Sequence, residues 1–303
     1  MAEIAARIQQ LKQEKNALIL AHVYTTPEIQ DLADFVGDSL GLSRKSADAS
    51  VRQDKIIFCG VYFMAETAAL LSPQKKVFIP ELNAGCPMAD MADADGVVKL
   101  KNMHPGAAVV TYVNSTAAVK AVSDICVTSA NAVDIVRKLP QQKIIFVPDR
   151  SLGAYVAAQI PDKEIILWPG FCPTHHRILA EFLARVKAEH PQALILAHPE
   201  NNKNILDRAD FIGSTGQMQR YAAESAAKEF IIASENGLLH RLRTDNPAKK
   251  FYPVTPLAVC PNMKKNTPEK LLNVLENETN LVTVEQLTAD KARQAIQKML
   301  ELS

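Results

Sequence analysis

The chain alternates short, continuous apolar runs with longer segments in which apolar residues recur every three or four positions. Runs such as ALILAHV (17–23) and KIIFCG (55–60) have the length and composition of strands that are covered on both faces of a parallel sheet. SANAVDIVRKL (129–139) places its apolar residues on one side of a helix. This pattern predicts an α/β fold in which strands and helices alternate along the chain.

The pattern occurs three times. LADFVGDS (32–39), VSDICVTS (122–129) and RADFIGST (208–215) each carry an Asp and, five positions later, a hydroxyl residue. A polar ring residue stands 17 positions before each hydroxyl, at the end of an apolar run: His22, Tyr112 and His198. A Cys-Pro pair follows each hydroxyl after 47, 43 or 45 positions. We therefore predict three pseudo-symmetric repeats, each a small three-layer αβα sandwich with a short parallel sheet.

The repeats predict the domain organisation. We expect a first α/β repeat with an N-terminal helix at 1–86, a second at 87–172 and a third at 173–260. Residues 261–303 are expected to form a helical segment that packs on the repeats. Ligands of open parallel sheets bind beyond the carboxyl ends of the strands. If the repeats surround a pseudo-threefold axis, those ends face one central active site and the three Cys-Pro pairs converge there.

Composition narrows the class of protein. Hydrophobic residues make up 48% of the 303 residues, the formal charge is +1, and no basic run exceeds two residues. Neither nucleic acid nor a membrane surface is therefore an expected partner. The apolar runs are too short to span a bilayer, and the N-terminal stretch lacks the apolar core of a signal peptide. Five cysteines without such a signal favour the reducing cytoplasm over a disulfide framework.

Three of the cysteines, Cys86, Cys172 and Cys260, precede a proline. Proline suits the first turn of a helix, and the positive end of a helix favours the thiolate that binds a metal. Cys59 and Cys126 lie inside apolar runs and are interpreted as small core residues. Structural zinc normally requires four ligands, often in close pairs, and no C-x-x-C is present. We favour an iron–sulfur cluster whose fourth iron is open to substrate and acts as a Lewis acid.

Several motifs together resemble the quinolinate synthase (NadA) family: AHVYTTPEIQDLADFVGDS, GVYFMAE, YVNST, TSANA, PDRSLG, HPE, GSTGQM and CPNMKKNT. The resemblance implies three α/β domains around one [4Fe-4S] cluster that is held by three cysteines. It also implies the condensation of iminoaspartate with dihydroxyacetone phosphate to quinolinate, with loss of phosphate and two waters, in NAD biosynthesis. An aspartate-oxidising enzyme would be a possible functional partner.

Two positions depart from the family pattern. Val23 stands between the His and Tyr of the first motif, where the family usually has a polar residue. The single His after the second cysteine appears here as the pair His175-His176. We assign the family role to His175, three positions after the cysteine, and keep His176 as a rival.

The same residues suggest roles in the reaction. Four hydroxyls expected at helix starts could hold carboxylates or phosphate, although simple N-capping is the commoner use of such residues: Ser39, Ser129, Ser214 and Thr215. His22, His175 and His198 are expected to bind carboxylates or relay protons with pKa values near neutrality. Glu200 is the expected general base and Tyr24 its acid–base partner. Tyr112 and Asn114 complete the ring, whereas Lys264 and Lys265 are interpreted as a solvated pair.

Two other functions stay open at this point. An aconitase-like hydro-lyase would use the same open iron on another small carboxylic acid. A cluster-based oxygen or iron sensor would need no polar ring around its cavity, and the sequence offers no segment for DNA or protein binding. The ring of His, Tyr and Glu candidates therefore favours an enzyme.

Overall fold

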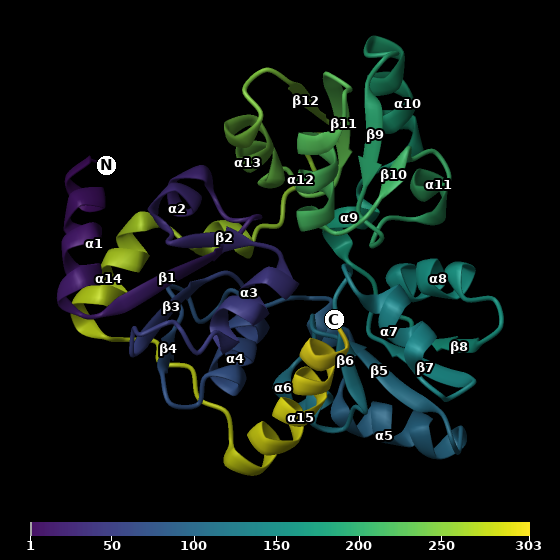
Figure 1. Ribbon diagram of the computed structural model, residues 1–303, viewed down its shortest axis with the longest axis horizontal. Helices are drawn as coiled ribbons and strands as arrows, with labels where there is room; N and C mark the ends of the chain where they lie inside the picture. The colour runs from purple at the N-terminus through teal and green to yellow at the C-terminus, as the bar shows by residue number, and fades with distance from the viewer. Residues whose placement is uncertain (1) are drawn as a thin grey trace.

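The computed structural model describes residues 2–303 and contains three four-stranded parallel sheets (Figure 1). The first has the order β2 (Phe35–Gly37), β1 (Ala17–His22), β3 (Lys55–Cys59), β4 (Lys76–Phe78). The second has the order β6 (Ile125–Val127), β5 (Ala108–Tyr112), β7 (Lys143–Val147), β8 (Glu164–Leu167). The third has the order β10 (Phe211–Ile212), β9 (Leu194–Ala197), β11 (Glu229–Ala233), β12 (Lys250–Pro253). The strand order is the same in all three, which confirms the predicted α/β class with three repeated sheets.

Alternating side chains of each central strand pack on opposite faces of its sheet. In β1, Leu18 and Leu20 contact one apolar cluster, whereas Ile19 and Ala21 contact another. The first cluster includes residues of α3 (Ser39–Ala47) and α4 (Tyr62–Leu71). The second includes residues of α1 (Ala2–Glu14), α2 (Pro27–Leu32) and α14 (Pro268–Asn277). The sheet is therefore the middle layer of an αβα sandwich.

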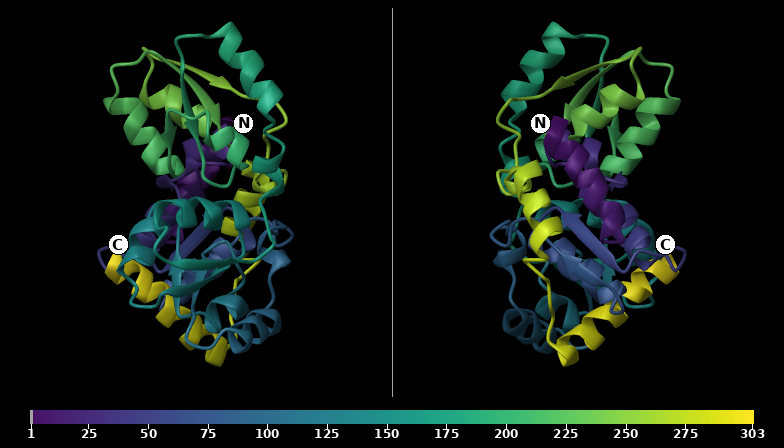
Figure 2. Two further views of the ribbon diagram at one scale, coloured as in Figure 1. Left: turned by 90° about the vertical axis from the view of Figure 1, so that its right-hand side faces the viewer. Right: turned by 90° about the vertical axis from the view of Figure 1, so that its left-hand side faces the viewer.

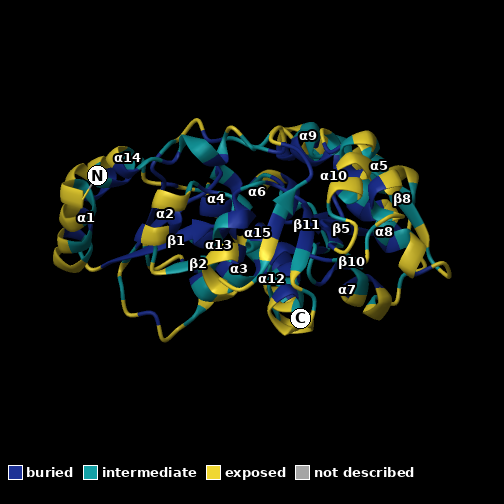
Figure 3. Ribbon diagram, turned by 90° about the horizontal axis from the view of Figure 1, so that it is seen from above, coloured by how far each residue is buried: buried dark blue, intermediate teal, exposed yellow. Residues whose placement is uncertain are grey.

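The other two sheets are covered in the same way (Figure 3). The second unit contains α5 (Ala94–Met103), α6 (Ala117–Ala121), α7 (Ala132–Lys138) and α8 (Arg150–Gln159). The third contains α9 (Pro173–His176), α10 (Ala180–Glu189), α11 (Lys203–Leu206), α12 (Thr215–Glu224) and α13 (Leu238–Asp245). Short 3-10 turns, η1 (Ala89–Met91) and η2 (Met263–Lys265), follow the first and third Cys-Pro pairs. The buried strands lie inside and the helices present their exposed faces outward.

The C-terminal segment packs against the first and the second unit. Its helix α14 packs beside α1 on the first sheet. The last helix, α15 (Gln286–Leu302), packs instead on the second unit, where Ala292 and Ile296 contact the same apolar cluster as β6 and α7 (Figure 1). The end of the chain thus holds the first two units together from outside.

The repeated aspartate has a structural use in every unit. Its carboxylate accepts a hydrogen bond from a backbone N–H of the first strand: Asp34 from Ile19 (2.8 Å), Asp124 from Val109 (2.7 Å) and Asp210 from Ile195 (2.8 Å). The chain needs such an acceptor where a buried strand begins. This explains why the Asp recurs in the sequence although it lies at the opposite end of the strand from the polar ring residues.

The third unit lies on one side of the other two, as the side views of Figure 2 show. Val23 takes part in this contact: it is fully buried in a cluster with Leu196, Met218 and Phe230 of the third unit. The apolar residue that departs from the family motif therefore fills an interface between units. Within residues 2–303, no helix is long and apolar enough to cross a membrane.

Candidate active site

The carboxyl ends of the strands surround one cavity. Thirteen of the fourteen predicted site residues border it: His22, Tyr24, Ser39, Cys86, Tyr112, Asn114, Ser129, Cys172, His175, His198, Glu200, Thr215 and Cys260. Residues more than 170 positions apart thus meet at one place, as the pseudo-symmetric arrangement predicted. Ser214 lies behind the wall of the cavity.

The three cysteine loops are attached to their units by the same backbone hydrogen bond. The donor opens the helix or turn after the third strand, and the acceptor is the carbonyl two positions before the cysteine. The pairs are Tyr62 to Ala84 (2.8 Å), Arg150 to Gly170 (2.8 Å) and Asn236 to Ala258 (2.8 Å). The cysteines therefore occupy equivalent positions in the three units, and all three border the cavity as free thiols.

The prediction that all three cysteines lie at the start of a helix, where the thiolate is favoured, is wrong in part. Only Cys172 directly precedes an α-helix, the four-residue α9, whereas Cys86 and Cys260 lead into turns before η1 and η2. Burial raises the pKa of Cys86 to about 12 and raises the pKa values of Cys172 and Cys260 as well. Burial thus outweighs the short helix end, so the free thiols are protonated at neutral pH.

The remaining two cysteines are core residues, as expected. Cys59 is fully buried at the end of β3, and Cys126 is fully buried in β6. Burial raises the pKa of both thiols, to about 12 for Cys126. Neither borders the central cavity.

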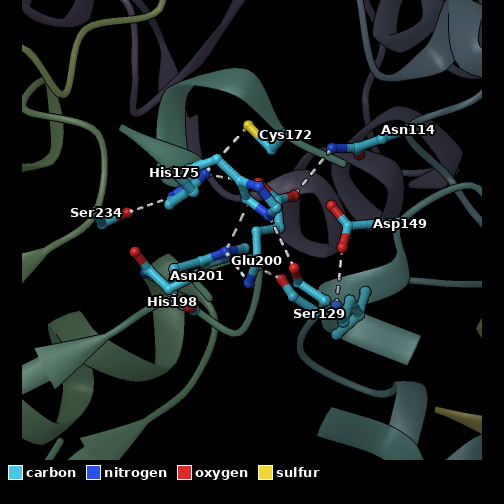
Figure 4. A network of polar contacts seen from close by, with 12 residues as sticks. Asn114, Ser129, Asp149, Cys172, His175, His198, Glu200, Asn201 and Ser234 are labelled. Carbon is cyan, nitrogen blue, oxygen red and sulfur yellow. Dashed lines mark hydrogen bonds and ion pairs between the residues drawn. The ribbon is translucent and has the colours of Figure 1, made fainter. Parts of the chain in front are cut away.

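Glu200 lies at the centre of a buried polar network (Figure 4). Its Oε1 accepts a hydrogen bond from the Tyr112 hydroxyl (2.8 Å), with Asn114 Nδ2 at 3.5 Å, and its Oε2 lies 2.7 Å from His175 Nδ1. Burial alone would raise the pKa of Glu200, but the histidines and these hydrogen bonds outweigh it and lower the pKa below its ordinary value. Glu200 is therefore a carboxylate at neutral pH.

His22 and His198 keep equivalent positions and make equivalent hydrogen bonds. The Nδ1 of each accepts a backbone N–H from the residue two positions on, Tyr24 (3.1 Å) and Glu200 (3.3 Å) respectively. Nδ1 is thus the acceptor and the proton lies on Nε2. His198 Nε2 lies 3.1 Å from the Ser129 hydroxyl in the cavity wall.

The expectation of near-neutral pKa values for these two histidines is wrong. Burial lowers the pKa of His22 to about 4 and that of His198 to about 3, against a partial opposing effect of nearby carboxylates. The free energy needed to remove an imidazolium from water is larger than the stabilisation that the nearby carboxylates provide. Near pH 7 both rings are neutral hydrogen-bond donors rather than proton carriers.

The lowered pKa values of His22 and His198 can be tested by NMR spectroscopy. The imidazole nitrogens of His22 and His198 should show the neutral Nε2–H tautomer from pH 8 down to about pH 5. Long-range ¹H–¹⁵N spectra of the iron-free chain would report it, with His22→Ala and His198→Ala variants to assign the signals. A protonation step near pH 6.5 at either ring would contradict the burial argument.

Tyr24 and His175 are joined through Ser234. The Tyr24 hydroxyl lies 2.8 Å from Ser234 Oγ, which lies 3.2 Å from His175 Nε2. His176, the rival of His175, turns away: it contacts Ser151 (2.9 Å) and stacks on Phe171 outside the cavity. The structure therefore places His175 at the cavity.

Ser39 and Thr215 each occupy the first position of a helix, α3 and α12, and border the cavity. Ser214 caps α12 in a capping box with Gln217 and donates a hydrogen bond to Asp38 Oδ2 (2.9 Å). Its side chain therefore has the simple capping use and joins the third unit to the first. None of the described residues that line the cavity is Lys or Arg.

The interpretation of Lys264 as solvated is wrong. Its ammonium lies 2.9 Å from Oε1 of Glu235, a fully buried carboxylate at the cavity wall that sequence reasoning missed. The same carboxylate accepts hydrogen bonds from the N–H groups of Cys260 (3.0 Å) and Gly237 (2.7 Å). Lys264 also donates to the Tyr24 carbonyl (2.5 Å), whereas Lys265 contacts only the Asn83 carbonyl (2.7 Å).

This contrast predicts different stabilities for two variants. Lys264→Met leaves the buried Glu235 carboxylate without its cation and should lower the free energy of unfolding by about 1–3 kcal/mol. Lys265→Met removes a single contact near the surface and should change it by less than about 0.5 kcal/mol. Urea unfolding of the iron-free variants measures both, and equal effects would show that the ion pair does not stabilise the fold.

Sequence reasoning also missed Asp149, Ser234 and Asp38. Asp149 and Glu235 both stand two positions after the third strand of their units, so the repeat itself could have identified them. Asp149 is fully buried, and Leu152 N–H donates to it (2.8 Å). Burial and the charge of Glu200 raise the pKa of Asp149 well above its usual range. Asp38 and Ser234 carried no such signal.

Comparison with known proteins gives matches over nearly the whole chain. Residues 6–301 match the family described as NadA, quinolinate synthetase A protein. A protein named quinolinate synthase from Caldicellulosiruptor saccharolyticus is 51% identical over 301 residues, 99% of this chain and 99% of that protein. Proteins of the same name from Methanosarcina barkeri and Geobacter metallireducens are 52% and 50% identical, each over 99% of this chain and 97% of the relative.

Proposed function

Because the chain belongs to the quinolinate synthetase A family, we propose that it condenses iminoaspartate with dihydroxyacetone phosphate to quinolinate, releasing phosphate and water, in NAD biosynthesis. The relatives that carry the name quinolinate synthase cover almost the full chain at about half identity. The observation that carries the proposal is the convergence of three cysteines, one from each unit, on a cavity that also holds two buried glutamates, two phenols and three histidines.

The residues present fit an iron–sulfur cluster. Cys86, Cys172 and Cys260 supply three soft sulfur donors on one cavity. Cys86 and Cys260 pack against an apolar cluster that includes Met64 and Met263. We propose that these cysteines hold a [4Fe-4S] cluster. When bound, its iron without a protein ligand would supply Lewis-acid chemistry.

The side chains around Glu200 are suited to move protons. A continuous chain of hydrogen bonds runs from the Tyr24 hydroxyl through Ser234 and His175 to Glu200. Burial and the Glu200 charge raise the pKa values of Tyr24 and Tyr112 well above the usual range, so both phenols stay protonated donors. Glu200 is then the proton acceptor, and Tyr24 is placed to return a proton at the other end.

Anions would be held without lysine or arginine. The hydrogen-bond donors at the cavity are of three kinds. They are the neutral Nε2–H groups of His22 and His198, the hydroxyls of Ser39, Ser129 and Thr215, and the backbone N–H groups that begin α3 and α12. Tyr112 and Asn114 add a phenol and an amide. Ser214 contributes by holding Asp38. We propose that the substrate carboxylates and phosphate bind to these groups.

Other parts of the proposal follow from the substrates. Iminoaspartate must come from a reaction that oxidises aspartate, so a functional link to an aspartate-oxidising enzyme is expected. The free cysteines suit a reducing compartment, and we propose the cytoplasm. The boundaries 1–86, 87–172 and 173–260 for the units, and 261–303 for the final segment, are supported by the three separate sheets, each of which lies within one range.

The test is an anaerobic assay of the reconstituted protein. Iminoaspartate and dihydroxyacetone phosphate together should yield quinolinate and phosphate, and omission of either substrate should yield no quinolinate. Citrate and malate serve as controls, since their turnover without any quinolinate would identify a hydro-lyase and contradict the proposal.

A further inference from the structure

A second group of metal donors overlaps the predicted cluster site. Cys172, His175 and Glu200 bring a sulfur, an imidazole nitrogen and a carboxylate oxygen within 4.8 Å of one another. His175 Nδ1 lies 3.3 Å from Cys172 Sγ and 2.7 Å from Glu200 Oε2 (Figure 4). This group shares only Cys172 with the three cysteines, and it needs neither Cys86 nor Cys260.

The three donor types are those that zinc prefers. Zinc binds Cys sulfur at about 2.3 Å and His nitrogen or carboxylate oxygen at about 2.0–2.2 Å. Tetrahedral geometry with these bonds separates neighbouring donors by roughly 3.3–3.7 Å. The Cys172–His175 pair is already near that separation, and the His175–Glu200 pair needs to open by roughly 0.6 Å. The spacing C-P-T-H within one helical turn fixes the first two ligands relative to each other.

The surroundings support the ligands in the way metal sites require. Ligating histidines and carboxylates normally have their second polar atom held by a neighbour. Here His175 Nε2 contacts Ser234 Oγ (3.2 Å), and Glu200 Oε1 accepts from Tyr112 (2.8 Å). His175 and Glu200 are 1% and 3% exposed, so little water has to be displaced from them.

We propose that the cluster-free chain binds one zinc ion through Cys172, His175 and Glu200, with a fourth position open to the cavity. Sites of nitrogen, oxygen and sulfur donors generally bind zinc more tightly than ferrous iron. Since Cys172 would serve both metals, zinc in this site excludes assembly of the cluster. That competition rests on the proposed function, whereas zinc binding itself does not.

Cobalt(II) is the probe for the site. Iron-free protein, kept reduced and anaerobic, should bind one Co²⁺ with a sulfur-to-cobalt charge-transfer band and the strong visible bands of a tetrahedral ion, and one equivalent of Zn²⁺ should remove them. Cys172→Ala and His175→Ala should weaken binding by more than about 100-fold, since even supporting residues contribute 10–100-fold. Glu200→Gln should weaken it by at least about 10-fold.

Matched variants separate this site from the other candidates. Cys86→Ala, Cys260→Ala and His176→Ala should bind Co²⁺ as the unaltered chain does, because none of them touches the three ligands. Circular dichroism and urea unfolding of each iron-free variant confirm that it is folded. Loss of binding in Cys86→Ala or Cys260→Ala equal to that in Cys172→Ala would overturn the proposal, as would full binding in His175→Ala.

Cluster reconstitution tests the competition separately. Zinc-loaded chain should take up much less iron than zinc-free chain, judged by iron content and visible absorbance. His175→Ala keeps all three cysteines and should take up the same iron with or without zinc. If zinc-free protein takes up no iron at all while Co²⁺ still binds as described, the proposed cluster fails and the zinc site stands.

Discussion

Alanine at Cys86, Cys172 or Cys260 is expected to remove the proposed iron–sulfur cluster from anaerobically reconstituted protein. The unaltered chain should bind close to four irons, and each of the three variants should retain well under one. The reason is that each cysteine comes from a different unit and each borders the same cavity, so no neighbouring thiol can replace a missing one. Iron and sulfide analysis with visible absorbance measures the result.

Cys59→Ala and Cys126→Ala are the controls for this prediction. Both thiols are fully buried in apolar clusters away from the cavity, and alanine leaves only a small space. These variants should bind as much iron as the unaltered chain, although their free energy of unfolding should fall by about 1 kcal/mol. Equal iron loss in all five variants would show that the repeat does not define the ligands.

Glu200→Gln should keep the full proposed cluster and lose most of the proposed activity. Glutamine preserves the shape and can still accept the Tyr112 hydroxyl, but it carries no charge and cannot take up a proton. A general base typically contributes about 10²–10⁴-fold to the rate. The expected result is therefore a fall of that size in kcat with iron content unchanged, from quinolinate formation and absorbance measured on one anaerobic sample.

A surface substitution supplies the comparison for Glu200. Glu229→Gln alters a carboxylate at the amino end of β11, where Glu229 pairs with Lys250. This variant should leave kcat and iron content unchanged. Cluster loss in Glu200→Gln would make this residue structural. Near-normal turnover would instead transfer the role of base to His175, the ring that contacts Glu200 directly.

The repeat made most of the fold predictable. Three copies of one pattern gave the sheets, the position of their carboxyl ends and the meeting of Cys86, Cys172 and Cys260, because strand order and spacing are local properties that recur. The pKa values of His22 and His198 were not predictable, since the burial that lowers them comes from all three units together. No local sequence pattern indicates that the three units together bury these two histidines.

Two of the errors in detail have a common physical origin. Ser214 meets Asp38 across 176 positions, and Lys264 meets the Tyr24 carbonyl across 240. Contacts of this kind depend on how the units sit against each other, which no pattern within one unit contains. The Cys-Pro pairs were interpreted as helix starts, and two of them open tight turns instead, because proline fits both structures.

The distribution of the cysteines over three units also determines when the proposed metal centre can form in the cell. Synthesis proceeds at about 5–20 residues per second, so the ribosome adds Cys260 roughly 10–35 s after Cys86. During that interval the nascent chain contains two thiols of the proposed centre, but it lacks the third, and it also lacks the helices α14 and α15 that cover the first two sheets. Maturation of the proposed cluster is therefore a step that follows translation, and the half-built site is the form that a scavenging metal or an oxidant meets first.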